Sequence, residues 1–203
     1  MTDEALQERV AAAVAEANPV MVEVGSADAQ EALEGAFAGV DAIVVAIGNR
    51  QPCKPRTLAP SMVDIRNAAV ACKVPRLVML SSFGVGGDPL PWKSWVRYLW
   101  GGMLSTVLRT AWHDLVAMEA AALDNGGCVD VLVVRPTGLS PWLAAVGDWR
   151  LFRTPADPPI GYGVAKQDVA KFMIQEAVAP TIHSAVVTIG GVPGAYADEI
   201  LSH

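Results

Sequence analysis

Short apolar runs that alternate with helical segments constrain the fold of this chain more than any other feature. The runs are DAIVVAIG (41–48), RLVMLSS (76–82), VDVLVVRP (129–136) and SAVVTIGG (184–191). A run that is apolar on nearly every residue is typical of a strand buried on both faces of a parallel sheet. A fifth strand is expected at VMVEVG (20–25).

The segments between these runs have the spacing and the end signals of helices. Helices are expected at 3–17, 28–39, 61–74, 93–123 with a break at 101–102, and 166–179, with a proline-containing loop at 49–60 and an irregular stretch at 137–163. Strands that alternate with helices predict an α/β fold, in which right-handed crossovers join a parallel sheet covered on both faces. We expect a single domain over 1–203.

Composition and charge exclude several classes of protein. With 52% hydrophobic residues the chain is not expected to be disordered, and its net charge of -6 disfavours nucleic acid and anionic membranes as partners. Three scattered cysteines and three histidines without HxxxH spacing predict no metal site. The acidic start is unlike a signal peptide, and the apolar stretch 98–108 is shorter than the roughly 20 residues that span a bilayer. We expect no membrane span and a cytoplasmic location, or an organellar one if the N-terminus is incomplete.

Ligands of open parallel sheets bind beyond the carboxyl ends of the strands. In this chain the loops at that edge begin at Gly25, Gly48, Ser81 and Pro136. The candidate functional residues are therefore sought first in these four loops.

Five segments, in order, resemble one known family. They are GSADAQEALEGAFAGVDAIVVAIG, IRNAAVACKVPRLVMLSSFGVGG, LRTAWHDLVAMEAAL, DVLVVRPTGLS and KQDVAKFM. Together they are similar to the NAD(P)H-binding atypical short-chain dehydrogenases, the group near NmrA-like proteins and the biliverdin/flavin reductases. The resemblance covers about residues 20–191 and implies a Rossmann-like, doubly wound parallel sheet of about five strands.

The opening of the family pattern is missing. The family begins with a strand and a GxxGxxG turn, whereas here no glycine precedes Gly25, and the strand 20–25 is similar to the family's third. The resemblance thus implies an N-terminally truncated sheet. Two lost hydrogen bonds to the pyrophosphate, at about 1.5–3 kcal/mol each, predict weak cofactor binding. A truncated gene model is one alternative.

The resemblance also implies which residues form the site. The cofactor would pass Gly25-Ser26, where the family usually has Gly-Asp, and then the ends of the next three strands. The cofactor-binding candidates are Gly25, Ser26, Ala46, Ile47, Gly48, Ser81, Pro136, Thr137 and Gly138, and the catalytic candidates are Ser82 and Asp114. Ser82 would bond a substrate carbonyl or hold the nicotinamide amide, or it is simply a capping serine.

The segment TAWHDLVAME is similar to a family helix that often reads Asp-His-Glu. Asp114 and Glu119 match its acids, whereas Leu115 replaces the histidine. A capped or solvated helix is the alternative. Tyr162 and Lys166 have YxxxK spacing, but they lie after the RP strand and glycines flank the tyrosine, so we interpret the match as coincidence.

These features predict an NAD(P)H-dependent oxidoreductase that passes hydride to a small planar acceptor: a flavin, quinone or carbonyl. NADP is the slightly preferred cofactor, and the substrate is a small molecule. The alternatives are a non-catalytic NAD(P)-binding regulator or assembly factor, or a truncated inactive chain. All six tryptophans lie between residues 92 and 149. They would rim a pocket for a planar ring, pack as a lid, or form a dimer face, so a homodimer or a protein partner stays open.

Overall fold

The computed structural model describes residues 26, 28–48, 58–85, 109–140, 142–154 and 157–193. Its elements are α2 (Ala29–Phe37), β1 (Ala42–Val45), α3 (Leu58–Ala71), β2 (Arg76–Leu80), α5 (Arg109–Leu123), β3 (Asp130–Pro136), β4 (Gly138–Ser140), β5 (Arg150–Phe152), β6 (Gly163–Ala165), α6 (Lys166–Val178) and β7 (Ala185–Gly190). The strand expected at 20–25, which includes Gly25, and the helix expected at 3–17 lie outside the described residues. Within them, no helix is long and apolar enough to cross a membrane.

The main sheet has five strands in the order β1-β2-β3-β7-β5. The pairs β1–β2, β2–β3 and β3–β7 are parallel, which confirms the α/β fold class. The prediction of purely parallel pairing is wrong at β5, because β5 runs antiparallel to β7. The stretch 137–163 is also not irregular throughout, since it holds β4, β5 and the first residue of β6. These strands have three residues each, too few to show a period in sequence.

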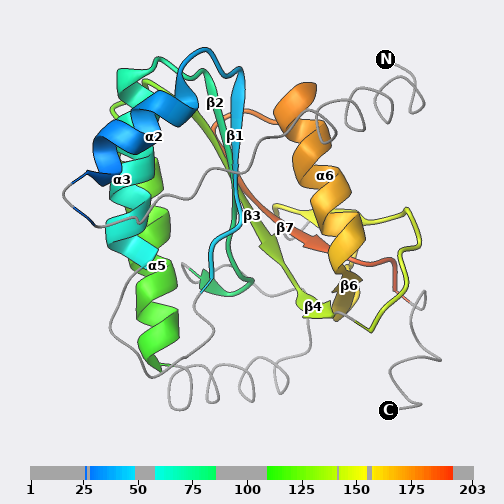
Figure 1. Ribbon diagram of the computed structural model, residues 1–203. Coiled ribbons are helices and arrows are strands. Elements are labelled where there is room, and N and C mark those ends of the chain that lie inside the picture. Colours follow the sequence, from blue (N-terminus) through cyan, green and yellow to red (C-terminus); the bar gives the residue numbers. More distant parts are fainter. Residues whose placement is uncertain are drawn as a thin grey trace.

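Helices cover both faces of this sheet. Figure 1 shows α2, α3 and α5 on one side and α6 on the other. Along β2, Leu77 and Met79 point into the first core, whereas Val78 points into the second, as the two-residue period of a strand requires. The apolar runs therefore reflect burial on two faces.

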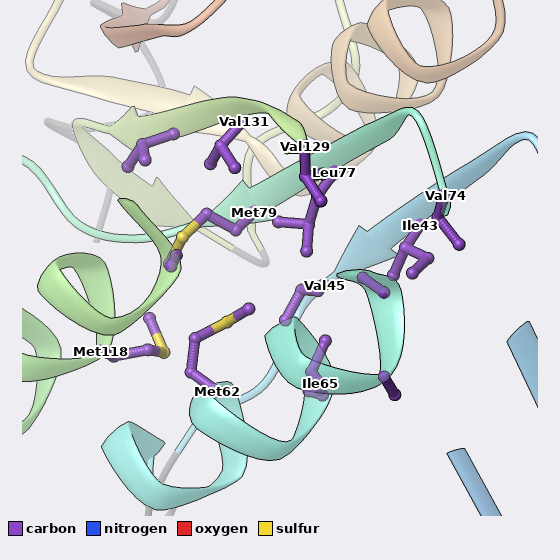
Figure 2. Close-up of a cluster of buried hydrophobic side chains, with 14 of the residues drawn as sticks. Ile43, Val45, Met62, Ile65, Val74, Leu77, Met79, Met118, Val129 and Val131 are labelled. Atoms are coloured by element: carbon purple, nitrogen blue, oxygen red, sulfur yellow. The ribbon is translucent and has the colours of Figure 1, made fainter. Parts of the chain in front are cut away.

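The larger core lies between the sheet and helices α3 and α5. Met62 of α3 and Met118 of α5 are fully buried there against Met79 and other strand residues, as Figure 2 shows. Truncation of such a methionine to alanine costs about 2–5 kcal/mol, because the cavity collapses only in part. This core fixes α5, and with it the acidic residues of that helix, against the sheet.

The prediction that the first of the four apolar runs is buried on both faces is wrong for β1. Ile43 and Val45 are buried, but Val44 is 43% exposed. Within the described residues β1 stands at the end of the strand order, with a neighbour on one side only. An edge strand receives less cover than a central one.

Helix α3 begins before the predicted start at residue 61. It starts at Leu58 because the Asp114 carboxylate accepts the backbone N–H groups of Leu58 and Ala59, at 3.2 and 3.3 Å. Pro60 is tolerated in this first turn, where its missing N–H is not needed. The helix ends at Ala71, where Lys73 adopts a left-handed φ of 55°.

Candidate functional site

The carboxyl ends of β1, β2 and β3 lie side by side. The register pairs Val45 with Met79 and Leu80 with Val134, so the residues that follow these strands share one edge of the sheet. The predicted residues brought together there are Ala46, Ile47, Gly48, Ser81, Ser82, Pro136, Thr137 and Gly138. Ser26 is exposed just before α2, where its carbonyl accepts the N–H of Ala29 at 3.2 Å.

The two serines after β2 have different surroundings. The N–H groups of Ser81 and Phe83 donate to carbonyls of β3, at 2.8 and 3.1 Å, and extend the strand pairing past Leu80. Neighbours in an extended chain point to opposite sides. Ser81 therefore points inward, 8% exposed, whereas Ser82 is only half-buried. Of the two hydroxyls, that of Ser82 is the more accessible at this edge.

A buried polar cluster lies directly beneath the edge. The hydroxyl of Ser81 donates to Oε1 of Glu119 on α5. Arg135 of β3 donates from Nε to Oε1 at 3.0 Å and from Nη2 to Oε2 at 2.5 Å. Glu119 and Arg135 are 4% and 5% exposed. Sequence reasoning matched Glu119 to the family helix but missed its partner, although a single arginine inside an apolar strand is a signal that it needs a buried acid.

Asp114 of α5 contacts the start of α3. It is 2% exposed, and its two carboxylate oxygens accept the first N–H groups of α3. An aspartate in this position satisfies helix N–H groups that have no partner within the helix. This geometry gives Asp114 a capping function, whereas its catalytic role stays a prediction.

The turn after β3 carries a buried polar atom for which the described residues provide no hydrogen-bond partner. The N–H of Thr137 donates to the Ile189 carbonyl at 2.9 Å, but its Oγ1 is buried and has no hydrogen-bond partner within the described residues. A buried hydroxyl without a partner is costly. A polar ligand group could satisfy it, which fits a cofactor at this edge.

Gly138 and Gly48, two glycines of this edge, differ in what an added side chain would contact. A Cβ on Gly138 would lie 2.6 Å from the Tyr162 carbonyl oxygen, which itself accepts the Gly138 N–H at 2.8 Å. Gly138 is therefore required by contact within the chain. A Cβ on Gly48 would meet no atom of the described residues within 4 Å, so that part of the chain leaves space open beside Gly48.

Tyr162 and Lys166 do not share a helix. Tyr162 precedes β6 and is 53% exposed, whereas Lys166 is the first residue of α6. A tyrosine-lysine pair that transfers a proton needs both side chains at one reacting group. The placement of Tyr162 before β6 and of Lys166 at the start of α6 agrees with coincidental spacing.

The tryptophans divide between core and surface. Trp149 packs edge-on against Phe172, with ring centroids 6.0 Å apart, under α6. Trp142 is 80% exposed beyond β4. Trp92, Trp95 and Trp100 lie outside the described residues.

A second polar cluster lies at the amino ends of the strands. Asp130 bonds Nη1 of Arg76 at 2.7 Å and Nδ1 of His183 at 2.6 Å. Burial raises the pKa of Asp130, but the His183 and Ser184 hydrogen bonds and the Arg76 charge outweigh it and lower that pKa to about 2. This cluster is at the opposite end of the sheet from the candidate site.

A mostly parallel sheet with helices on both faces, and with glycine and hydroxyl residues at its carboxyl edge, defines a Rossmann-like α/β domain. A family model described as NAD(P)H-binding matches residues 6–180, and the chain belongs to this NAD(P)H-binding family. The match confirms the resemblance to NAD(P)H-binding short-chain dehydrogenases. Comparison with curated protein sequences found no match.

Solved structures share this fold at low sequence identity. The oxidoreductase ylbE from Lactococcus lactis has a TM-score of 0.63 at 15% identity, over 92% of this chain and 78% of its own. A short-chain dehydrogenase/reductase from Veillonella parvula, in complex with NADP, has a TM-score of 0.63 at 18% identity, over 93% and 80%. The chuY protein of E. coli has a TM-score of 0.61 at 17% identity, over 93% and 92%.

Proposed function

We propose that this protein is an NAD(P)H-dependent oxidoreductase that reduces a small planar acceptor. One observation carries the proposal: Ser82 is half-buried at the carboxyl end of β2, while Ser81 beside it is turned inward onto Glu119. A hydroxyl available at this edge suits the orientation of a polar group on a ligand. Membership of the NAD(P)H-binding family supports the choice of cofactor.

The residues proposed to hold the cofactor follow β1 and β3. Ala46, Ile47 and Gly48 line the end of β1, where open space faces Gly48. Thr137 offers the Oγ1 that lacks a partner among the described residues. Once bound, NAD(P)H supplies the hydride, and the chain supplies position and polarity.

Ser82 is proposed as the residue that orients the acceptor. Its hydroxyl would donate to a carbonyl oxygen of the acceptor or bond the carboxamide of the cofactor. The exposed side chains of Trp142 and Tyr162, 80% and 53% exposed, lie on the segments that lead out of β4 and into β6. Aromatic surfaces of this kind favour a planar ring as substrate, such as a flavin or a quinone.

We also propose that the protein binds both dinucleotides weakly and prefers NADP slightly over NAD. Titration of the protein with each dinucleotide in a calorimeter measures both affinities directly. Tighter binding of NAD than of NADP would reverse the assigned preference without affecting the assigned site.

An assay with a matched variant tests the activity. Oxidation of NADPH and NADH is followed with FMN, quinones and aldehydes as acceptors, in the wild type and in Ser82→Ala. We expect turnover with at least one acceptor and a kcat about tenfold lower in the variant, which is the scale of one lost hydrogen bond in the transition state. No turnover by folded wild-type protein with any acceptor would contradict the proposal.

A non-catalytic NAD(P)-binding regulator is the second candidate. It is favoured by the separation of Tyr162, which precedes β6, from Lys166 at the start of α6, and by the capping contacts of Asp114. Such a protein would bind a dinucleotide without turnover and would bind a protein partner more tightly in its presence. A pull-down with and without NADP distinguishes the two candidates.

A further inference from the structure

We propose that Glu119 and Arg135 are positioning residues, which hold the turns after β2 and β3 in the arrangement that a dinucleotide requires. This inference rests on the proposed function, because it assigns the cofactor to the edge formed by those turns. It assigns neither residue a contact with the cofactor itself.

The chain connects each turn directly to the cluster. Arg135 precedes Pro136 and Thr137, and Ser81 precedes Ser82. The carboxylate of Glu119 receives hydrogen bonds from Ser81 and from Arg135, so a single side chain of α5 fixes the start of both turns. The backbone hydrogen bond from Ser81 N–H to the Val134 carbonyl, at 2.8 Å, also joins these two strands.

Burial makes this arrangement stiff. Ser81, Glu119 and Arg135 are each less than one-tenth exposed. If one of their hydrogen bonds were broken, water could therefore not take the place of the lost partner. The two parallel bonds between guanidinium and carboxylate also fix direction as well as distance. Movement of either turn therefore has to break charged bonds in a medium of low dielectric constant.

The same chain holds a matched control at the opposite end of the sheet. Glu176 of α6 is 5% exposed, pairs with Nη2 of the buried Arg76 at 3.4 Å, and accepts the hydroxyl of Thr181. It thus repeats the combination of glutamate, arginine and hydroxyl. It lies on the α6 face at the amino ends of the strands, away from the proposed site.

The test compares Glu119→Gln with Glu176→Gln in the full chain. Each variant is titrated with NADPH, and its backbone amide exchange is measured without cofactor. We expect Glu119→Gln to weaken NADPH binding by about tenfold and to speed exchange at Phe83 and Thr137, as loss of preorganisation predicts. Glu176→Gln should lower the melting temperature comparably, yet leave affinity and both amides within about twofold of the wild type, since distant sites act independently.

Each outcome decides the proposal. Folded Glu119→Gln protein with affinity and exchange like those of Glu176→Gln would overturn it. If the wild type binds neither NADPH nor NADH, the proposed function fails, and with it the claim that a dinucleotide needs this arrangement. Amide exchange at Phe83 and Thr137 then still shows whether Glu119 holds the two turns. If Glu119→Gln does not fold, Arg135→Lys and Arg76→Lys replace the pair, because lysine keeps the charge but loses the fork.

Discussion

Arg135 of β3 donates two hydrogen bonds to Glu119 of α5, at 3.0 and 2.5 Å, and both side chains are almost fully buried. This pair ties a helix to the strand that leads into the candidate site. The two charges are tolerated in the interior because they pair with each other. Removal of one leaves the other buried without a compensating charge.

The first prediction concerns this pair. Glu119→Ala should lower the free energy of unfolding by about 3–5 kcal/mol, because Arg135 is left charged and buried. The double variant Glu119→Leu/Arg135→Met should lose clearly less than the sum of its two single variants, since no buried charge remains. Urea unfolding of the wild type, Glu119→Ala, the double variant and its two single variants measures this, and strict additivity would contradict it.

A second prediction separates capping from catalysis at Asp114. Asp114→Ala should cost about 1–2 kcal/mol of unfolding free energy, because the first N–H groups of α3 lose their acceptor. Asp114→Asn keeps one oxygen and should cost less. Chemical denaturation gives both values. An Asn variant that is stable and binds cofactor but has no turnover would instead establish a catalytic role.

The third prediction is that a change at Thr137 raises the stability of the fold but lowers its affinity for NADPH. Thr137→Val should raise the free energy of unfolding by about 1 kcal/mol, because it removes a buried hydroxyl that has no partner among the residues the structure describes. NADPH affinity should fall by about three- to tenfold, the scale of one neutral hydrogen bond. Thr181→Val is the control, since that hydroxyl bonds Glu176. The control should lose stability and keep affinity, and a stability loss in Thr137→Val would contradict the account.

The fourth prediction contrasts two glycines of the edge. Gly138→Ala should destabilise the fold by about 1–3 kcal/mol, because its Cβ would meet the Tyr162 carbonyl at 2.6 Å. Gly48→Ala should fold normally, since no atom of the described residues would lie within 4 Å of the new Cβ, but should weaken NADPH binding. Thermal unfolding and titration of both variants test this, and equal effects on stability would refute the distinction.

A fifth prediction concerns pH. The pKa of Asp130 is lowered from 3.8 to about 2 in the folded protein, so its ionised form stabilises the fold above pH 3.8. That stabilisation should disappear as the pH falls from 3.8 towards 2, and Asp130→Asn should lack it at every pH. Urea midpoints of both proteins from pH 6 downwards, at intervals of about half a unit, should converge in acid. A constant difference would argue against this role.

The strands of the main sheet were predictable where local pattern reports burial on two faces. Leu77, Val78 and Met79 alternate between two cores, and an apolar run is the direct result. The start of α3 was not predictable, because its cap is a side chain 56 residues away. The end of α3 was not predictable either. Helices often end at a glycine in the left-handed conformation, whereas here Lys73 adopts that conformation.

The candidate site was predictable as a set of strand ends, but not in its internal order. The resemblance located Ser81 and Ser82 together, whereas the direction of each side chain depends on Glu119 from a distant helix. Asp114 matched a family acid by position, yet its carboxylate accepts the first N–H groups of α3. Sequence spacing reports neighbours along the chain and leaves long-range pairing undetermined.

The most direct test of the account is a titration of the isotope-labelled wild-type protein with NADPH, followed through its backbone amide resonances. The account predicts saturable shifts concentrated at Ala46 to Gly48, at Ser81 to Phe83, and at Thr137 and Gly138. It would be contradicted by the absence of saturable shifts, or by shifts centred at the other end of the sheet around Arg76, Asp130 and His183.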